Sequence, residues 1–128
     1  MEQTKTPFKV IIAGTRTFSD YDLLCRKCDE FFQEQTQTRS IVIVSGTARG
    51  ADRLGERYAA EHGYSVERYP ANWNVYGKAA GYIRNSDMAN ASDALICFWD
   101  GQSRGSGHMI DLARKKGLSV RIFKYTNT

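Results

Sequence analysis

Short apolar runs alternate with segments of helical spacing along the whole chain, and this alternation most constrains its fold. Two of the runs, IVIV and ALICF, are apolar at every position, as in strands that are buried on both faces. The predicted strands cover residues 8–13, 41–44, 65–69, 94–99 and 118–124, and the predicted helices 19–35, 51–62, 78–90 and 106–116. Such alternation predicts parallel β-α-β units. Right-handed crossovers then give a Rossmann-like doubly wound α/β fold, with a mainly parallel five-stranded sheet and helices on both faces.

The predicted elements have conventional ends. Ser19 is a suitable N-cap for the first helix, and Gly63 and Gly117 suit the ends of two others. Residues 70–76 are expected to form a loop. With 128 residues, 41% of them hydrophobic, the chain fits one domain spanning residues 1–128. The first apolar run is typical of a strand rather than a signal peptide, and no run is long enough for a membrane span, so we expect a cytoplasmic protein without membrane contact.

Cysteine usage points to packing rather than chemistry. Three cysteines make no disulfide framework. Cys25 and Cys28 form a C-x-x-C pair, which can bind a metal or act in redox reactions, but they share one helix face with Leu24 and Phe31. No second Cys/His pair completes a zinc site, and a redox pair normally lies at a helix N-terminus. We therefore interpret them as core residues and predict no metal site.

Candidate ligand-binding residues gather where the predicted strands end, which is where doubly wound folds bind ligands. They are Gly14, Thr15 and Arg16 after the first strand, Ser45, Gly46, Thr47, Arg49, Gly50 and Asp52 after the second, and Gly101, Ser103, Gly105, Ser106 and Gly107 after the fourth. Taken singly, the glycines could serve only tight turns. Taken together, free N–H groups at helix starts and forked arginine side chains favour phosphate binding in one shared crevice.

The segment after the third strand adds aromatic residues and two further candidates. Trp73, Tyr76 and Tyr82 lie near Arg84 and Asn85 in the sequence PANWNVYGKAAGYIRNSDM. The aromatic rings could stack on a base or ribose while Arg84 reaches a phosphate, or they could merely close the end of the sheet. Both interpretations stay open. We interpret His108 as a residue of a first helical turn rather than a catalytic base, because no partner nucleophile is evident.

The stretches IIAGTR, VSGTARGADRLGERYA, GYIRNSDMANASDALICFWDG and SRGSGHMIDLA resemble the SLOG superfamily, specifically its small stand-alone proteins related to YspA and YpsA. The resemblance spans residues 9–123. It implies a Rossmann-like fold and a nucleotide-derived ligand, including NAD- and ADP-ribose-type molecules. The superfamily also includes the Lonely guy phosphoribohydrolases and DNA-processing protein A, which binds single-stranded DNA.

The resemblance to the Lonely guy enzymes can be followed residue by residue. Gly105 and Ser106 match the Gly-Thr pair of their glycine-rich phosphate loop, and Arg84 resembles the arginine that precedes their substrate pocket. Their catalytic glutamate, three residues after the threonine, falls on Met109. The expected acid is therefore missing. SGTARGAD and Arg84-Asn85 also resemble the corresponding parts of DNA-processing protein A.

Three functions follow from these observations. The first is a sensor or binding module for an NAD- or ADP-ribose-like molecule or a nucleoside phosphate, with Arg16, Arg49 and Arg84 neutralising phosphate charge and Asp52 or Asp100 accepting from ribose hydroxyls. The second is a nucleotide N-glycosidase in which Asp100, the candidate catalytic residue, replaces the missing glutamate, because such a reaction needs a carboxylate.

The third function is single-stranded nucleic-acid binding, supported only by the net charge of +4 and by distant similarity. The basic residues are spread along the chain, as on an ordinary solvated surface, so we do not expect nucleic acid to be the partner. We expect no required cofactor, although Mg²⁺ can accompany phosphates. Self-association into a homo-oligomer is compatible with a chain of this size, with the aromatic segment after Tyr69 as its candidate contact.

Overall fold

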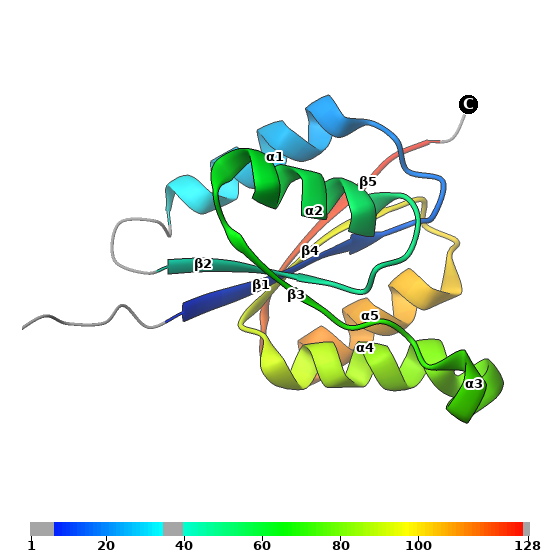
Figure 1. Ribbon diagram of the computed structural model, residues 1–128. Coiled ribbons are helices and arrows are strands. Elements are labelled where there is room, and N and C mark those ends of the chain that lie inside the picture. The colour runs from blue at the N-terminus through cyan, green and yellow to red at the C-terminus, as the bar shows by residue number, and fades with distance from the viewer. Residues whose placement is uncertain (1–6, 35–39, 127–128) are drawn as a thin grey trace, which may run out of the picture.

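The computed structural model describes residues 7–34 and 40–126, and it has the predicted doubly wound α/β architecture (Figure 1). All strand pairs are parallel, and the sheet order is β3-β2-β1-β4-β5. The elements, in chain order, are β1 (Pro7–Gly14), α1 (Tyr21–Gln33), β2 (Ser40–Ser45), α2 (Ala51–His62), β3 (Ser65–Arg68), α3 (Trp73–Tyr76), the 3₁₀ turn η1 (Gly77–Ala79), α4 (Ala80–Ala91), β4 (Ala94–Trp99), α5 (Arg104–Lys115) and β5 (Ser119–Lys124).

Helices cover both faces of the sheet, which explains why the central strands are apolar at every position. Figure 1 shows α1 and α2 above the sheet and α4 and α5 below it. Along β1, Val10 and Ile12 join the core under α1 and α2, whereas Ile11 and Ala13 join the core against α4 and α5. Because side chains alternate between the two faces of a strand, a strand between two helix layers needs apolar residues throughout.

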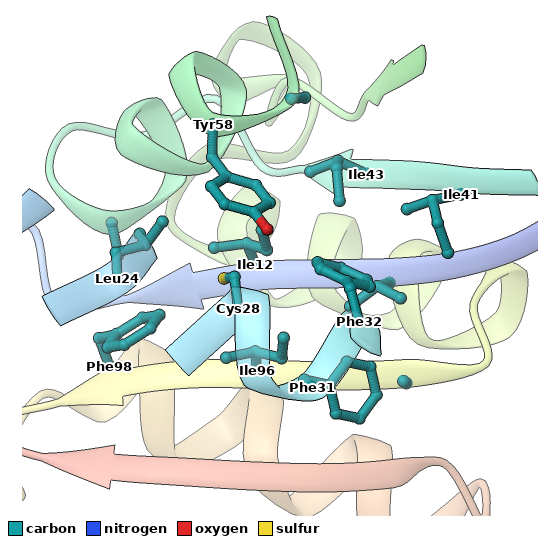
Figure 2. Close-up of a cluster of buried hydrophobic side chains, with 14 of the residues drawn as sticks. Ile12, Leu24, Cys28, Phe31, Phe32, Ile41, Ile43, Tyr58, Ile96 and Phe98 are labelled. Carbon is teal, nitrogen blue, oxygen red and sulfur yellow. The ribbon is translucent and has the colours of Figure 1, made fainter. Parts of the chain in front are cut away.

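The core under α1 and α2 contains Cys28 of the C-x-x-C pair (Figure 2). Cys28 is fully buried with Leu24 and Phe32, and burial raises the pKa of its thiol. Cys25 is half-buried at the edge of this core. From α2, the Tyr58 ring stacks near Phe32, and its hydroxyl leaves the core to donate to an aspartate of α1 at 2.7 Å. The position of Cys28 confirms the interpretation of a core residue.

Three local predictions were wrong in detail. Asp20, not Ser19, caps α1, because the Asp20 side chain accepts from the Leu23 N–H at 3.1 Å. The expected loop at residues 70–76 contains the short helix α3, which Asn72 caps by accepting from the Val75 N–H. Helix α5 begins two residues before Ser106. The predicted end of the first helix at residue 35 lies outside the described residues.

No helix in the described ranges is both long and apolar enough to cross a membrane.

The strand order places a topological switch point at the centre of the sheet. From β1 the chain moves outward through β2 to β3, and it then returns to β4 on the other side of β1 before ending at β5. The loops that follow β1 and β4 therefore leave the sheet in opposite directions. Ligand crevices in open α/β sheets form at this point, outside the carboxyl ends of the strands.

Candidate functional site

A crevice of about 350 Å³ lies at this switch point. It receives residues from the loops after β1, β2 and β4, and also from α4. Its lining residues are Ala13, Gly14, Thr15, Arg16, Ala48, Asp52, Arg84, Asn85, Met88, Ser103, Gly105, Ser106 and Met109. The loops that the sequence predicted to share a crevice therefore do meet. The contribution of Met88 was not predicted, because an apolar residue on a helix carries no sequence signal for a site.

Arg84 of α4 reaches across the crevice to the β2–α2 loop. Its Nη1 donates to the carbonyl oxygen of Gly46, and its Nε donates to Asn85 Oδ1 at 3.0 Å. A Cβ atom on residue 46 would lie 2.8 Å from both Arg84 Nη1 and Asp52 Oδ2. Because residue 46 has no side chain, the Arg84 guanidinium and the Asp52 carboxyl group can both lie close to its backbone. Burial lowers the pKa of Arg84, while the charge of Asp52 opposes that change.

Asp52 is a buried carboxyl group at the edge of the crevice. It is 5% exposed, in the first turn of α2, and its Oδ2 accepts from the Ala48 N–H at 3.1 Å. Burial raises the pKa of Asp52 to about 6, although the Ala48 N–H and the positive charge of Arg84 act in the opposite direction. A perturbed carboxyl group inside a cleft is a typical feature of functional sites.

The loop between β2 and α2 contains one residue with a strained backbone and is held by hydrogen bonds. Thr47 has a φ of +65°, which is unusual for a β-branched residue. Its N–H donates to Ser45 Oγ at 3.1 Å, and Ser45 in turn donates to Glu56 Oε2 at 2.6 Å. Burial alone would raise the pKa of Glu56, but the bond from Ser45 and the charge of Arg68 hold it below its usual value. Strain of this kind persists where surrounding contacts hold it, often at binding sites.

Two candidate residues of this loop hold the loop in place and do not line the crevice. Ser45 is completely buried and is engaged by Glu56. Gly50, with φ of +78°, lies so close to the β1–α1 loop that a Cβ atom there would be 2.4 Å from the Thr15 carbonyl oxygen. The Thr15 hydroxyl also accepts from the Asp100 N–H at 3.1 Å. Thr15 thus links all three loops, since its carbonyl oxygen accepts from the N–H of Ala51 at 3.4 Å.

Asn85 joins α4 to the first turn of α5. It is 6% exposed, and its Nδ2 donates to the Gly105 carbonyl oxygen at 3.3 Å and lies 3.2 Å from His108 Nδ1. The Tyr82 ring packs edge-on against His108, with 4.5 Å between ring centroids. Burial lowers the pKa of His108. His108 therefore holds the two helices together beside the crevice.

The first turn of α5 faces the crevice with small residues. Its N-cap is Ser103, whose side chain makes no capping bond within the described chain. Gly105 and Ser106 line the crevice, whereas Gly107 lies against the ring of Trp99. Helix starts with free N–H groups are suited to bind anions. Met109, one turn later, is buried at the floor of the crevice and supplies only apolar contact.

Asp100 and Gly101 belong to the β4–α5 turn and not to the crevice lining. Asp100 Oδ1 accepts from the N–H groups of Gln102 at 2.9 Å and Ser103 at 2.8 Å, and these bonds lower its pKa. Asp100 lines a separate hollow that includes Lys124. Of the two carboxyl groups named as candidates from the sequence, Asp52 lines the crevice, whereas Asp100, the candidate catalytic residue, does not.

Two smaller hollows adjoin the crevice and share Arg16 and Arg84 with it. One, of about 280 Å³, lies between the β2–α2 loop and Trp73, and it includes Gly46, Thr47 and Arg49. The other, of about 190 Å³, lies between Trp73 and Tyr82 and also includes Lys78 and Gly81. Lys78 was not a predicted site residue. A lone lysine at a predicted helix start gives no signal until the fold places it beside the aromatic rings.

Comparison with known proteins agrees with this architecture. The model of the YspA, cpYpsA-related SLOG family matches residues 8–76, which is more than half of the chain. The chain belongs to this SLOG family. It is also 34% identical over 125 residues to the Gene 61 protein of Mycobacterium phage D29, an alignment that covers 90% of this chain and 95% of the phage protein.

Two solved structures share the fold of this SLOG protein. DNA processing protein A from Streptococcus pneumoniae matches 91% of the chain with a TM-score of 0.68 at 20% identity. DNA processing protein A from Helicobacter pylori, whose single-stranded DNA binding mode is described, matches 91% of the chain with a TM-score of 0.65 at 22% identity. The chain spans 50% and 65% of these two proteins, respectively. At such low identity, the likeness shows the fold alone.

Within the described ranges of this SLOG protein, no group of three or more His, Cys, Asp or Glu residues is arranged to hold a metal ion. The charged groups that line the crevice are Arg16, Asp52 and Arg84. Two positive charges and one carboxyl group of raised pKa make the crevice favourable for an anion.

Proposed function

We propose that this SLOG protein binds a nucleotide-derived ligand, of the ADP-ribose or nucleoside-phosphate type, and acts as a sensor or binding module. The observation that carries the proposal is the meeting of Arg16, Arg84 and the first turn of α5 in one crevice at the switch point. Arginine forks and free N–H groups at a helix start are both phosphate-binding chemistry. The family resemblance supports a nucleotide as the molecule that carries the phosphate.

The contacts suggest how the ligand would lie. A phosphate group would accept from the N–H groups around Gly105 and Ser106 and from the guanidinium of Arg16, which is exposed and free to turn toward it. Arg84 is already engaged by Gly46 and would add charge from a fixed position. Asp52 lines the same crevice, and its carboxyl group can accept from a ribose hydroxyl in either protonation state.

Titration with ADP-ribose tests this proposal. We expect binding to raise the melting temperature by several degrees at saturating ligand, because a ligand at about 100 times its Kd stabilises the native state by about 2.7 kcal/mol. The shift should shrink as salt rises, since an exposed arginine contact is screened. Adenosine, which has no phosphate group, should give a much smaller shift.

Two charge-matched variants sharpen the result. Arg16→Gln should weaken ADP-ribose binding about tenfold, the effect expected for the loss of one charge-assisted hydrogen bond. Arg114→Gln removes the same charge from an exposed position in the last turn of α5 and should leave binding unchanged. Equal affinities for the two variants, or no shift across a broad panel of nucleotides, would refute the proposal.

A further inference from the structure

An unusual group of exposed apolar side chains lies next to the crevice. Trp73, Val75 and Tyr76 of α3 and Tyr82 of α4 are between 45% and 66% exposed. In Figure 1, α3 projects at the lower right, beyond α4 and α5. Single exposed apolar residues are ordinary, but clusters of them mark interaction sites. Helix α4 also lines the crevice, and Trp73 of α3 lines the two hollows that adjoin it.

The members of this group differ in what they face. Trp73 lines both of the smaller hollows beside the crevice, and Tyr82 lines the hollow of about 190 Å³. Tyr76, although 49% exposed and on the same short helix, lines neither of them. The hollow between Trp73 and Tyr82 shares Arg16, Arg84, Asn85 and Gly105 with the crevice, so the two are direct neighbours.

The Trp73 ring and the Arg84 guanidinium come together on one side of α4. A Cβ atom on Gly81 would lie 3.5 Å from Trp73 Cη2 and 3.7 Å from Arg84 Nη2, which is ordinary van der Waals contact for both. Tyr82 is held in place by its edge-on contact with His108. The hollow is therefore bounded by an aromatic ring on each helix, with a glycine between them and a fixed positive charge at its inner end.

Charge decides what kind of molecule fits this hollow. Its lining contains three cationic side chains, Arg16, Lys78 and Arg84, and no acidic one among the described residues. An occupant therefore needs a planar apolar part for the rings and negative charge for the cations. Its volume lies below the roughly 300 Å³ at which ligand pockets for drug-sized molecules begin, so it suits one small ring system.

We propose that the hollow between Trp73 and Tyr82 is a nucleobase subsite, in which a nucleotide with its phosphate in the crevice stacks its base on Trp73. The inference rests on the proposed function and extends it, because it assigns a place in the structure and a stacking partner to the base of the ligand. Stacking on an aromatic ring accepts any base, since every base has a π-face. The site therefore selects for the presence of a base more than for its identity.

The test compares AMP with ribose 5-phosphate, which has the same phosphate and sugar but no base. Binding is measured by calorimetry, and stacking by the fluorescence of Trp73. We expect AMP to bind at least tenfold more tightly than ribose 5-phosphate and to quench tryptophan emission, while ribose 5-phosphate binds without quenching. Trp73→Ala should weaken AMP binding about 10- to 100-fold and leave ribose 5-phosphate binding within about twofold.

Two further variants separate stacking from other effects. Trp73→Phe keeps an aromatic face and should retain most of the affinity for AMP while losing the quenching, because the remaining Trp99 lines neither the hollow nor the crevice. Tyr76→Ala, the matched exposed aromatic residue outside both hollows, should change neither affinity nor quenching. If the variants Trp73→Ala and Tyr76→Ala bind AMP equally, the subsite is refuted even though the phosphate site stands.

The remaining outcomes are also decisive. Failure of both AMP and ribose 5-phosphate to bind would overturn the proposed function itself. Trp73 emission that changes on dilution of the protein alone, together with a change in sedimentation, would show that a second copy of the chain covers the rings, and would overturn the subsite. Tight binding of a single-stranded oligonucleotide without measurable binding of AMP would overturn it as well.

Discussion

Ionisation of Asp52 should weaken the fold as the pH rises. Its pKa in the folded protein is about 6, because burial in the first turn of α2 disfavours the charged form, whereas its ordinary value is 3.8. The folded state therefore holds this proton more tightly than the unfolded state does. The stabilisation is fully present below pH 3.8 and is lost as the pH rises through about 6. The difference between the two pKa values corresponds to about 3 kcal/mol.

Urea unfolding of the native protein and of Asp52→Asn, from pH 4 to pH 8 at constant ionic strength, measures this effect. Asparagine keeps the shape of the side chain and can still accept from the Ala48 N–H, while all other titrating groups are common to both proteins. The stability of the native protein relative to the variant should fall by about 2.5 kcal/mol across this range, mostly below pH 6. A difference that is independent of pH, or that grows in the opposite direction, would refute the burial argument.

Two further predictions concern α2 packing and the crevice charge. Gly55→Ala places a Cβ atom 2.8 Å from Ile12 Cβ, so overpacking of about 1–3 kcal/mol should exceed the roughly 1 kcal/mol gained in helix propensity. Gly105→Ala should be neutral or stabilising, because a Cβ atom there would meet no atom of the described chain within 4 Å. Equal melting temperatures of the Gly55→Ala and Gly105→Ala variants in calorimetry would contradict this reasoning. The diphosphate of ADP-ribose keeps its charge between pH 5 and 8. ADP-ribose should therefore bind several-fold more tightly at pH 5 than at pH 8, because protonated Asp52 repels it less. In titration calorimetry, the affinity of Asp52→Asn should show no such dependence on pH.

The sequence predicted the class of the fold because its signal is local. In β1, an apolar residue at every position from Val10 to Ala13 already requires cover on both faces of the sheet. Glycine at residue 63 ends α2 in the left-handed conformation, as its position after a helical pattern indicated. The short helix α3 was missed because four residues cannot display a helical period. Its cap, Asn72, was read as part of a loop.

The candidate site was predicted in outline and corrected in detail. The three loops after β1, β2 and β4 could be placed at one edge because parallel strands end on the same side. Which acid enters the crevice could not be predicted, since Asp52 and Asp100 both follow strands in the sequence. In the fold, the Asp100 carboxylate accepts hydrogen bonds from N–H groups of its own turn, whereas Asp52 is buried and lines the crevice.

By itself, the sequence determined what depends on residues close together in the chain: the elements, their apolar faces and the glycine-rich loops that follow the strands. Only the tertiary structure decided which distant groups share a space. The approach of Arg84 to Gly46 and Asp52 joins positions 38 and 32 residues apart, and it depends on the path of α4 across the sheet. The hollow between Trp73 and Tyr82 likewise includes Arg16 of the β1–α1 loop and Gly105 of α5, which lie far from α3 and α4 in the chain. Side-chain burial, and hence pKa and charge pairing, is set by such long-range packing.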